Sequence, residues 1–296
     1  MTTPRRNSVD LHCHTVRSDG VLEPRSLYAQ MRAWGSTLVA ITDHDTLSGV
    51  RELRDAGLGS PDGDGPRIIA GVEINTRVDE EIVAIGGDAE RIGELHVLGF
   101  GVDPDDEDFE RTLASQREGR SQRLERTLER LEQLGIDVRS DLPDTPGGID
   151  SLGRPHVARA LVASGHAESV NDAFRRYLEP GAPGYVQREG IGPRSAIEAI
   201  TAAGGIASLA HPPWAPDQSA VIAQLIDWGL RGLEVYYHHF DDATVERMAA
   251  FAQEQGLLPT GGSDYHGDIM DYATAQHSTY VPAEVGERLI HAIRRG

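Results

Sequence analysis

The amino-acid sequence predicts an α/β protein, either an α/β barrel or a doubly wound parallel sheet, with a helical insertion. Two observations predict this class. Short apolar segments of strand length alternate with amphipathic segments of helical period along most of the chain. One interval, from about Asp103 to Glu189, lacks such strands and is helical. With 296 residues, 39% of them apolar, the chain is long enough to bury a large core.

The barrel or sheet is predicted from segments at both ends of the chain. The first strand is expected in "NSVDLHCHT", followed by a helix in "SLYAQMRAWG" that ends at Gly35. Further strands are expected in "STLVAITDHDT", "RIIAGVEINT", "ELHVLGFGVD", "GGIASLAHP", "LRGLEVYY" and "LLPTGGSDYHG". Helices between the later strands are expected in "SAIEAITAAG", "SAVIAQLIDWG" and "TVERMAAFAQEQG". This alternation indicates parallel βα units.

The interval 103–189 is predicted to form a helical cap on the barrel. It opens with "DPDDEDFE", whose negative charges stabilise a helix N-terminus, and continues as the long amphipathic helix "RTLASQREGRSQRLERTLERLEQLG". After the loop "DLPDTPGGIDSLG" come shorter helices in "RPHVARALVASG" and "SVNDAFRRYLEPG". The predicted domains are therefore a barrel of residues 1–102 and 190–296 and a cap of residues 103–189.

The composition limits the partners of the protein. A net charge of −19 opposes the binding of long duplex nucleic acid, which usually needs a basic face. Small anions remain compatible, because bound divalent cations can reverse the local potential. No apolar run approaches the length of a membrane span, and the residues after Met1 do not resemble a secretory signal. A single cysteine cannot form an intrachain disulfide. We therefore expect a cytoplasmic protein without a membrane partner, and make no prediction of its oligomeric state.

Residues that bind metal ions follow most of the predicted strands. In parallel α/β folds the loops after the strands share one face, so these side chains are expected to converge there. The candidate ligands are His12, His14, Asp19, His44, Glu73, His96, His211, Asp264 and His266. Nitrogen and oxygen donors without an obligatory thiolate favour Mn²⁺, Zn²⁺ or Fe²⁺ over a structural cysteine-type zinc site.

The first strand shows the pattern most clearly. Side chains alternate along a strand, so His12 and His14 share one face and Cys13 lies on the other. Asp19, in the following loop, is expected to fold back towards the same mouth. Cys13 is expected to be a small buried hydrophobe rather than a nucleophile or a ligand.

Each candidate ligand also has a structural alternative. A single histidine such as His96 is commonly hydrogen-bonded within a fold, and Glu73 alone can cap a helix or pair with an arginine. Asp43 and Asp45 can be solvated loop carboxylates. The metal interpretation is favoured for the set, because chance would otherwise have to place a histidine or carboxylate at the end of nearly every strand.

Three further candidates lie near the expected pocket. Arg154 and His156, in "GRPHVARAL", either reach the substrate or anchor the start of their helix. His238, after "EVYY", also follows a strand end. The arginines at 111–130 are expected to form a mostly solvated helix face with glutamate partners at helical spacing.

Together these motifs resemble the PHP (polymerase and histidinol phosphatase) family of metal-dependent phosphoesterases. The matching segments are "DLHCHTVRSDG", "AITDHDTLSG", "GVEINT", "HVLGF", "AHP" and "GGSDYHGD", in the family's order. The chain looks closest to the stand-alone bacterial branch that acts on nucleotides, whose members carry a helical insertion with a segment like "GRPH". Two departures from the family pattern concern substrate specificity. "INT" follows the glutamate of "GVEINT" where serine is common in the family, and the segment between Glu73 and His96 is longer than usual.

The resemblance implies a distorted (β/α)₇ barrel with two or three divalent metal ions, Mn²⁺, Fe²⁺ or Zn²⁺, at its carboxyl end. Carried over motif by motif, the ligands fall into three groups: His12, His14, Glu73 and Asp264; Glu73, as a bridge, with His96 and His211; and Asp19, His44 and His266.

The implied activity is hydrolysis of a phosphoester by a hydroxide that bridges the first two ions held by Glu73 and Asp264. Arg154, with His156 nearby, would bind the phosphoryl oxygens, and His238 would protonate the leaving oxygen. The expected substrate is a nucleoside 5′-monophosphate or 3′,5′-bisphosphate, then short oligonucleotides, with 3′–5′ exonuclease activity compatible. The alternatives are a histidinol-phosphate phosphatase, against which the "GRPH" insertion argues, and a non-catalytic metal-stabilised PHP module.

Overall fold

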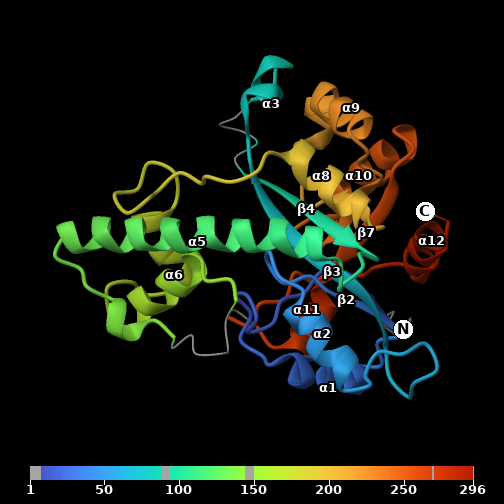
Figure 1. Cartoon of the computed structure of the whole chain (residues 1–296), viewed down its shortest axis with the longest axis horizontal. Helices are drawn as coiled ribbons and strands as arrows, with labels where there is room; N and C mark the ends of the chain where they lie inside the picture. Colours follow the sequence, from blue (N-terminus) through green and yellow to red (C-terminus); the bar gives the residue numbers. More distant parts are fainter. Residues whose placement is uncertain (1–7, 89–91, 93, 144–149, 269, 296) are drawn as a thin grey trace.

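The computed structural model describes residues 8–88, 92, 94–143, 150–268 and 270–295 (Figure 1). A seven-stranded sheet curls into a barrel, and its strands follow one another in chain order. The strands are β1 Val9–Asp10, β2 Leu38–Ile41, β3 Arg67–Arg77, β4 Glu94–Phe100, β5 Ile206–Leu209, β6 Gly232–Tyr237 and β7 Leu258–Gly262.

The barrel closes between its first and last strands. Leu11 N donates to Gly261 O at 3.1 Å, and Asp264 N donates to His12 O at 2.7 Å, so the chain after β1 runs beside the end of β7. The predicted α/β barrel with a helical insertion is confirmed, and the doubly wound sheet, with its two free edges, is the wrong alternative.

One strand runs against the expected direction. β4 pairs antiparallel with both β3 and β5, whereas the remaining neighbours in the sheet are parallel. A parallel pair needs a crossover that packs on the sheet, but the described part of the connection from β3 contains the short helix α3 (Glu80–Ala84), which projects away from the barrel (Figure 1). The expectation of parallel units throughout is therefore wrong at β4. His96 lies near the start of this reversed strand, directly opposite Asn75 of β3.

Helices surround the barrel, and the last of them packs against its inner apolar layer. They are α1 Pro24–Trp34, α2 Ser48–Asp55, α8 Pro193–Ala202, η3 Ala215–Gln218, α9 Ser219–Asp227, α10 Asp242–Glu254, α11 Tyr272–Ser278 and α12 Ala283–Ile293. In α1 the proline at the start needs no hydrogen-bond partner, Leu27 and Met31 are fully buried, and Gly35 ends the helix at φ 92°. Each such buried side chain contributes about 1.5–3 kcal/mol of transfer free energy.

The barrel has an inner and an outer apolar layer. Along β2, Val39 and Ile41 face the layer beneath the outer helices, while Leu38 and Ala40 face the inner layer. Helix α12 adds apolar side chains, Leu289 among them, to that inner layer. The polar residues that follow the parallel strands lie at the carboxyl ends of those strands.

The insertion is built on the long helix α5 (Glu107–Gln133), which projects to one side of the barrel (Figure 1). Asp106 caps it by accepting from Phe109 N at 2.8 Å. Its first half packs Phe109 and Leu113 into the barrel core, and its second half packs Leu128 into a separate core. That second core is shared with α6 Arg154–Ala163, α7 Val170–Ala173 and the π-helical η2 Phe174–Leu178, and the short helix η1 Arg139–Asp141 contacts α6.

Two sequence predictions stay open. The division into residues 1–102 with 190–296 and residues 103–189 remains a prediction, because α5 packs into both cores. The predicted loop at 141–153 lies partly outside the described residues. Among the helices of the described segments, none combines the length and the apolar character needed to cross a membrane.

Candidate metal centre

His12 and His14 stand side by side just after β1, and both are fully buried. Their rings lie 5.2 Å apart on the same side of the chain. Cys13 points the other way: its thiol donates to Ala40 O at 3.0 Å within the apolar core. The expected alternation of faces is confirmed.

A first group of possible ligands surrounds the two histidine Nε2 atoms. His12 Nε2 lies 3.2 Å from Glu73 Oε2 and 3.2 Å from Asp264 Oδ1. His14 Nε2 lies 3.2 Å and 3.1 Å from the same two oxygens. Glu73 comes from the middle of β3 and Asp264 from the loop after β7, so the closed barrel unites residues far apart in sequence.

Glu73 also belongs to a second group. Its Oε1 atom lies 2.8 Å from His96 Nδ1 and 3.4 Å from His211 Nε2. Each oxygen of this one carboxylate therefore faces a different group, as a bridging ligand requires. His96 reaches it because β4 is reversed, so the start of β4 lies beside β3 at the same mouth.

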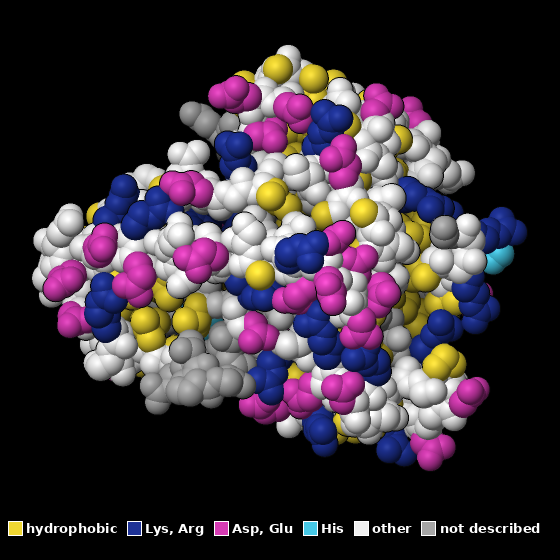
Figure 2. All heavy atoms as spheres, in the orientation of Figure 1, with side chains coloured by type: hydrophobic (Ala, Val, Ile, Leu, Met, Phe, Trp, Pro, Cys, Tyr) yellow, Lys and Arg dark blue, Asp and Glu magenta, His cyan; other side chains and the backbone are white. Residues whose placement is uncertain are grey.

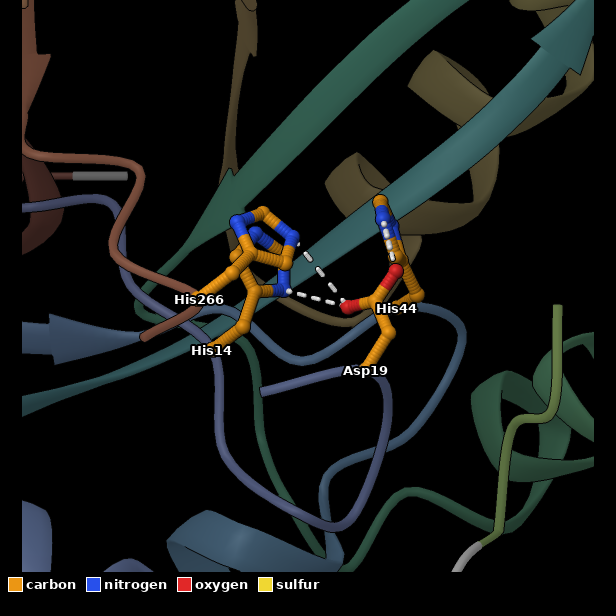
Figure 3. Close-up of side chains that lie close together, drawn as sticks. All are labelled: His14, Asp19, His44 and His266. Carbon is orange, nitrogen blue, oxygen red and sulfur yellow. Dashed lines mark ion pairs between the residues drawn. The ribbon is translucent and has the colours of Figure 1, made fainter. Parts of the chain in front are cut away.

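A third group surrounds Asp19, whose carboxylate lies between His44 on one side and His14 and His266 on the other (Figure 3). His266 Nε2 is 3.2 Å and His14 Nδ1 3.7 Å from Asp19 Oδ1, and His44 Nε2 is 3.4 Å from Asp19 Oδ2. The sequence pattern did not place His14 here. Its two ring nitrogens face two different groups.

The nine candidate ligands thus form three overlapping groups. In each group one ligand atom per residue lies within 4.8 Å of all the others. Two atoms bound to one ion at about 2.1 Å stand roughly 3.0–3.4 Å apart, depending on the coordination angle. The closest nitrogen–oxygen separations in the first group, 3.1–3.2 Å, fit that geometry.

Unsatisfied atoms support the same interpretation. His14 Nε2 and His44 Nδ1 are buried and make no hydrogen bond with the described residues, although carboxylate oxygens lie 3.1–3.2 Å away. Buried ring nitrogens without partners cost free energy. A cation shared with the carboxylates removes that cost, and the nitrogen and oxygen donor set suits Mn²⁺, Fe²⁺ or Zn²⁺.

The histidines hold the carboxylates in their charged form. Burial alone would raise the pKa of Glu73, but His44, His12 and His96 outweigh it and keep that pKa well below its ordinary value. In the same way, burial is outweighed at Asp19 by His44 and His266, which lower its pKa. Deprotonated carboxylates are the form that binds metal ions.

Backbone strain is concentrated at the same mouth. Among the described residues other than glycine, positive φ occurs at Asp45 (54°), His211 (34°) and Asp264 (48°). Such conformations persist only where surrounding contacts impose them. At Asp264 the contacts are the backbone bond to His12 O and a hydrogen bond from Tyr237 OH to Oδ2 at 3.1 Å, which leaves Oδ1 facing the histidines.

The ligand groups open into a cavity of about 290 Å³ whose far wall is rich in arginine. Arg120 Nε and Arg188 Nη2 lie 2.6 Å and 3.4 Å from Asp45 Oδ2. Arg123 and Arg154 both contact Glu94 Oε1, at 2.8 Å and 3.1 Å. Four guanidinium groups thus meet two carboxylates, which leaves this wall positively charged.

Arg188 Nε is buried and has no hydrogen-bond partner within the described segments. Burial lowers the pKa of Arg188 only to about 10, so the side chain stays charged at neutral pH. A buried, charged donor without a partner is costly, and an anionic ligand would relieve that cost.

The sequence did not predict that the two arginines on α5 are buried. Arg120 and Arg123 were expected on a mostly solvated face but are 7% and 6% exposed. Arg188, near the end of the insertion, was not singled out. The available signal was the stripe of buried positions on α5, which is apolar up to Leu113 and again from Leu124 but polar at Gln116, Arg120 and Arg123.

The other predicted residues lie in different places. Arg154 lines the cavity. His156 is buried, and its Nδ1 accepts from Gly153 N at 3.1 Å, which matches the anchoring alternative for this residue. His238 lines an adjoining pocket of about 180 Å³ together with the apolar Phe174 and Met270. Burial and His239 lower its pKa to about 4, so its ring is neutral near pH 7.

Two bacterial enzymes have sequences similar to this chain. The chain is 33% identical to the 3′,5′-nucleoside bisphosphate phosphatase of Chromobacterium violaceum, over 88% of this chain and 87% of that protein. It is 32% identical to the 5′-3′ exoribonuclease of Haemophilus influenzae, over 87% of this chain and 89% of that protein.

The fold is also similar to a solved structure from Bifidobacterium adolescentis, of a protein described as a metal-dependent phosphoesterase. The TM-score is 0.75 at 30% sequence identity, over 98% of this chain and 97% of that one. The model of the PHP domain family matches residues 10–179, more than half of the chain. The histidine and carboxylate motifs, the barrel that unites them and these similarities together show that the chain belongs to the PHP domain family.

Proposed function

We propose that the protein is a metal-dependent phosphoesterase that hydrolyses phosphomonoesters of nucleotides. The observation that carries the proposal is the sharing of one cavity by three overlapping histidine–carboxylate groups and four arginines. Two or three divalent ions, Mn²⁺, Fe²⁺ or Zn²⁺, would be held by the nine ligands described above. When bound, they would supply Lewis-acid polarisation of the phosphoryl group and a water nucleophile active near neutral pH.

The chain's own residues would fix the geometry of that chemistry. Glu73 would join two ligand groups rigidly, because its two oxygens face His12 and His14 on one side and His96 and His211 on the other. Tyr237 would keep Asp264 Oδ1 turned towards the first group by binding the other oxygen. Such preorganisation lets charge develop on the phosphoryl group without rearrangement of the site.

The arginine wall favours a substrate with a second anionic group. A phosphoester at the metal centre would leave space for another phosphate at Arg154 and Arg188, which both line the cavity. Arg188 Nε has no hydrogen-bond partner among the described residues, and guanidinium N–H groups suit phosphate oxygens. The adjoining pocket beside Phe174, Met270 and His238 is apolar enough for a nucleobase. A nucleoside 3′,5′-bisphosphate offers groups for all three parts, and the end of a short oligonucleotide offers similar ones.

The cellular setting is part of the proposal. The free, buried Cys13 is the only cysteine of the chain, which fits a reducing compartment such as the cytoplasm. The net charge of −19 disfavours long duplexes as partners.

A substrate panel tests the proposed activity. Phosphate release is measured with Mn²⁺ on a nucleoside 5′-monophosphate, a 3′,5′-bisphosphate, short oligonucleotides labelled at either end, and histidinol phosphate, beside an EDTA-treated control. We expect the bisphosphate to give the highest kcat/KM. Preferred cleavage of histidinol phosphate would contradict the nucleotide assignment. If none of the phosphoesters is hydrolysed, the alternative of a non-catalytic metal-stabilised module is favoured instead. The labelled oligonucleotides decide the direction, since 3′–5′ was expected and a curated relative is named a 5′-3′ exoribonuclease.

The role of the arginine wall is tested by Arg188→Met, with Arg111→Met on the exposed side of α5 as its control. Loss of a hydrogen bond to a charged group costs about 1.5–3 kcal/mol. We therefore expect R188M to raise KM for the bisphosphate roughly tenfold to a hundredfold. KM for the monophosphate should change much less. Equal effects of R188M on both substrates would contradict a second phosphate position there.

A further inference from the structure

Behind the candidate ligands, a buried carboxylate contacts two of them at once. Glu234, in the middle of β6, is fully buried. Its Oε1 atom lies 3.0 Å from His12 Nδ1, and its Oε2 atom accepts from His211 N at 2.8 Å. His12 belongs to the first ligand group and His211 to the second, so one side chain connects both groups from behind.

The geometry points to Glu234 as the residue that fixes the tautomer of His12 and holds the backbone of His211 in place for metal binding. This inference rests on the proposed metal-dependent function. His12 Nε2 faces Glu73 and Asp264, so it must present its lone pair there to bind a cation. The ring proton then lies on Nδ1, where Glu234 Oε1 accepts it. A carboxylate in this position fixes the ring orientation and makes the ligand more basic.

The second contact restrains a strained residue. His211 has a φ of 34°, which is unfavourable for a residue that carries a Cβ atom. The hydrogen bond from His211 N to Glu234 anchors this conformation and keeps the imidazole turned towards Glu73 Oε1. Both contacts are donations to Glu234, so both of its oxygens must be acceptors.

This requirement separates glutamate from glutamine. In Glu234→Gln the side chain has one acceptor and one donor, and the backbone N–H of His211 cannot change its role. The amide oxygen would therefore face His211, and the amide nitrogen would donate to His12 Nδ1. The proton of His12 would then have to lie on Nε2, the atom that faces Glu73 and Asp264.

The test compares two substitutions at this position with a nearby control. Glu234→Gln keeps the hydrogen bond from His211 N and moves the ring proton of His12 from Nδ1 to Nε2, whereas Glu234→Met removes both contacts. Thr260→Val is the control, because Thr260 is paired with Glu234 in the sheet and is equally buried, but its side chain bonds only Ser208 among the described residues.

Zn²⁺ affinity is measured for each protein by competition with a chelator, and the imidazole N–H signals of the Zn²⁺-loaded proteins are recorded by nitrogen-edited NMR. We expect E234Q to weaken the binding of one Zn²⁺ equivalent roughly 10- to 100-fold. It should also remove the downfield Nδ1–H signal of His12, which is assigned from its absence in H12N. E234M should weaken the binding of two Zn²⁺ equivalents, and T260V should weaken the binding of none.

The outcomes are distinguishable from failure of the proposed function. If the wild-type protein binds no Zn²⁺, Mn²⁺ or Fe²⁺, the metal-dependent function itself is wrong. If the wild type binds Zn²⁺ and folded E234Q binds it equally well with the His12 signal retained, the inference about Glu234 is wrong. Should E234Q fail to fold, a Zn²⁺-loaded wild-type protein whose His12 carries its proton on Nε2 would overturn the inference.

Discussion

At the scale of single residues, the centre depends on side chains that contact two neighbours at once. Glu73 faces both the first and the second ligand group, and His14 faces the first and the third. All nine candidate ligands were named from the sequence, since each carries a metal-binding side chain in a recognisable motif. Glu234 and Tyr237 were not, because their roles depend on distances to His12 and Asp264 that only the closed barrel creates.

His238 permits a test of the predicted general acid. With its pKa lowered to about 4 by burial and by His239, its ring has no extra proton to give near pH 7. We therefore expect H238Q to lower kcat less than about tenfold, whereas loss of a general acid costs roughly 10²–10⁴-fold. A loss in that larger range, with metal content unchanged, would show that His238 is the acid despite its lowered pKa.

His156 gives a pH dependence with a defined sign. Burial lowers its pKa to about 4 in the folded protein, against 6.5 for the ordinary side chain. The unfolded chain therefore binds more protons between these values, and the stability that neutral His156 contributes is present above about pH 6.5 and lost as the pH falls towards 4. In metal-free protein, the free energy of unfolding should fall by on the order of 3 kcal/mol more in the wild type than in H156Q across this range.

The glutamine of H156Q can still accept from Gly153 N, so the start of α6 keeps its contact. The exposed His291→Gln is the control and should follow the wild type. Denaturant titrations at a series of pH values give the comparison. Parallel curves for the wild type and H156Q would mean that His156 does not titrate as described.

At the scale of elements, the direction of β4 and the burial of polar residues on α5 could not be predicted from the sequence. His96 was predicted as a ligand from its motif, but the parallel-strand argument for it was wrong, because strand direction follows from the connection and not from the strand's own residues. On α5, the polar positions Arg120 and Arg123 lie in line with apolar ones. An amphipathic pattern shows that a face is buried only where the face is apolar.

Helix α5 offers a prediction about stability. Leu128 is 2% exposed in the core of the insertion, so Leu128→Ala should lower the free energy of unfolding by about 2–5 kcal/mol. Metal content should not change, because none of the nine candidate ligands lies in that core. Leu134→Ala, at a position 50% exposed, is the control and should cost much less. Loss of metal from folded L128A would contradict a centre carried by the barrel alone.

At the scale of the whole molecule, the positive cavity wall contrasts with an acidic protein. The net charge is −19, and the face shown in Figure 2 mixes acidic and basic side chains over α5 and the helices of the barrel. The barrel, the insertion and the family were predictable from periodicity and motifs. The concentration of arginines at the cavity was not, because it unites α5, α6 and the segment after η2.

This charge distribution predicts a dependence on substrate length. Phosphates beyond the cavity meet a surface of negative net charge, so kcat/KM should fall as single-stranded substrates lengthen from two to about twenty nucleotides and be lowest for duplexes. Rates are measured at constant ionic strength with one end labelled. A rate that rises with length would indicate a nucleic-acid surface outside the cavity.

The most direct test of the central claim measures metal content and phosphate release on the same preparations. The wild type, the wild type treated with EDTA, Asp264→Asn and the exposed control Asp242→Asn are compared with a nucleoside 3′,5′-bisphosphate and Mn²⁺. We predict hydrolysis by the wild type and by D242N and its loss after EDTA. D264N should lose metal. Its activity should also fall by more than the roughly 10- to 100-fold expected when a residue that only supports a metal ligand is replaced. Unchanged metal content and turnover in D264N, or full activity after EDTA, would contradict a phosphoesterase centre at this mouth of the barrel.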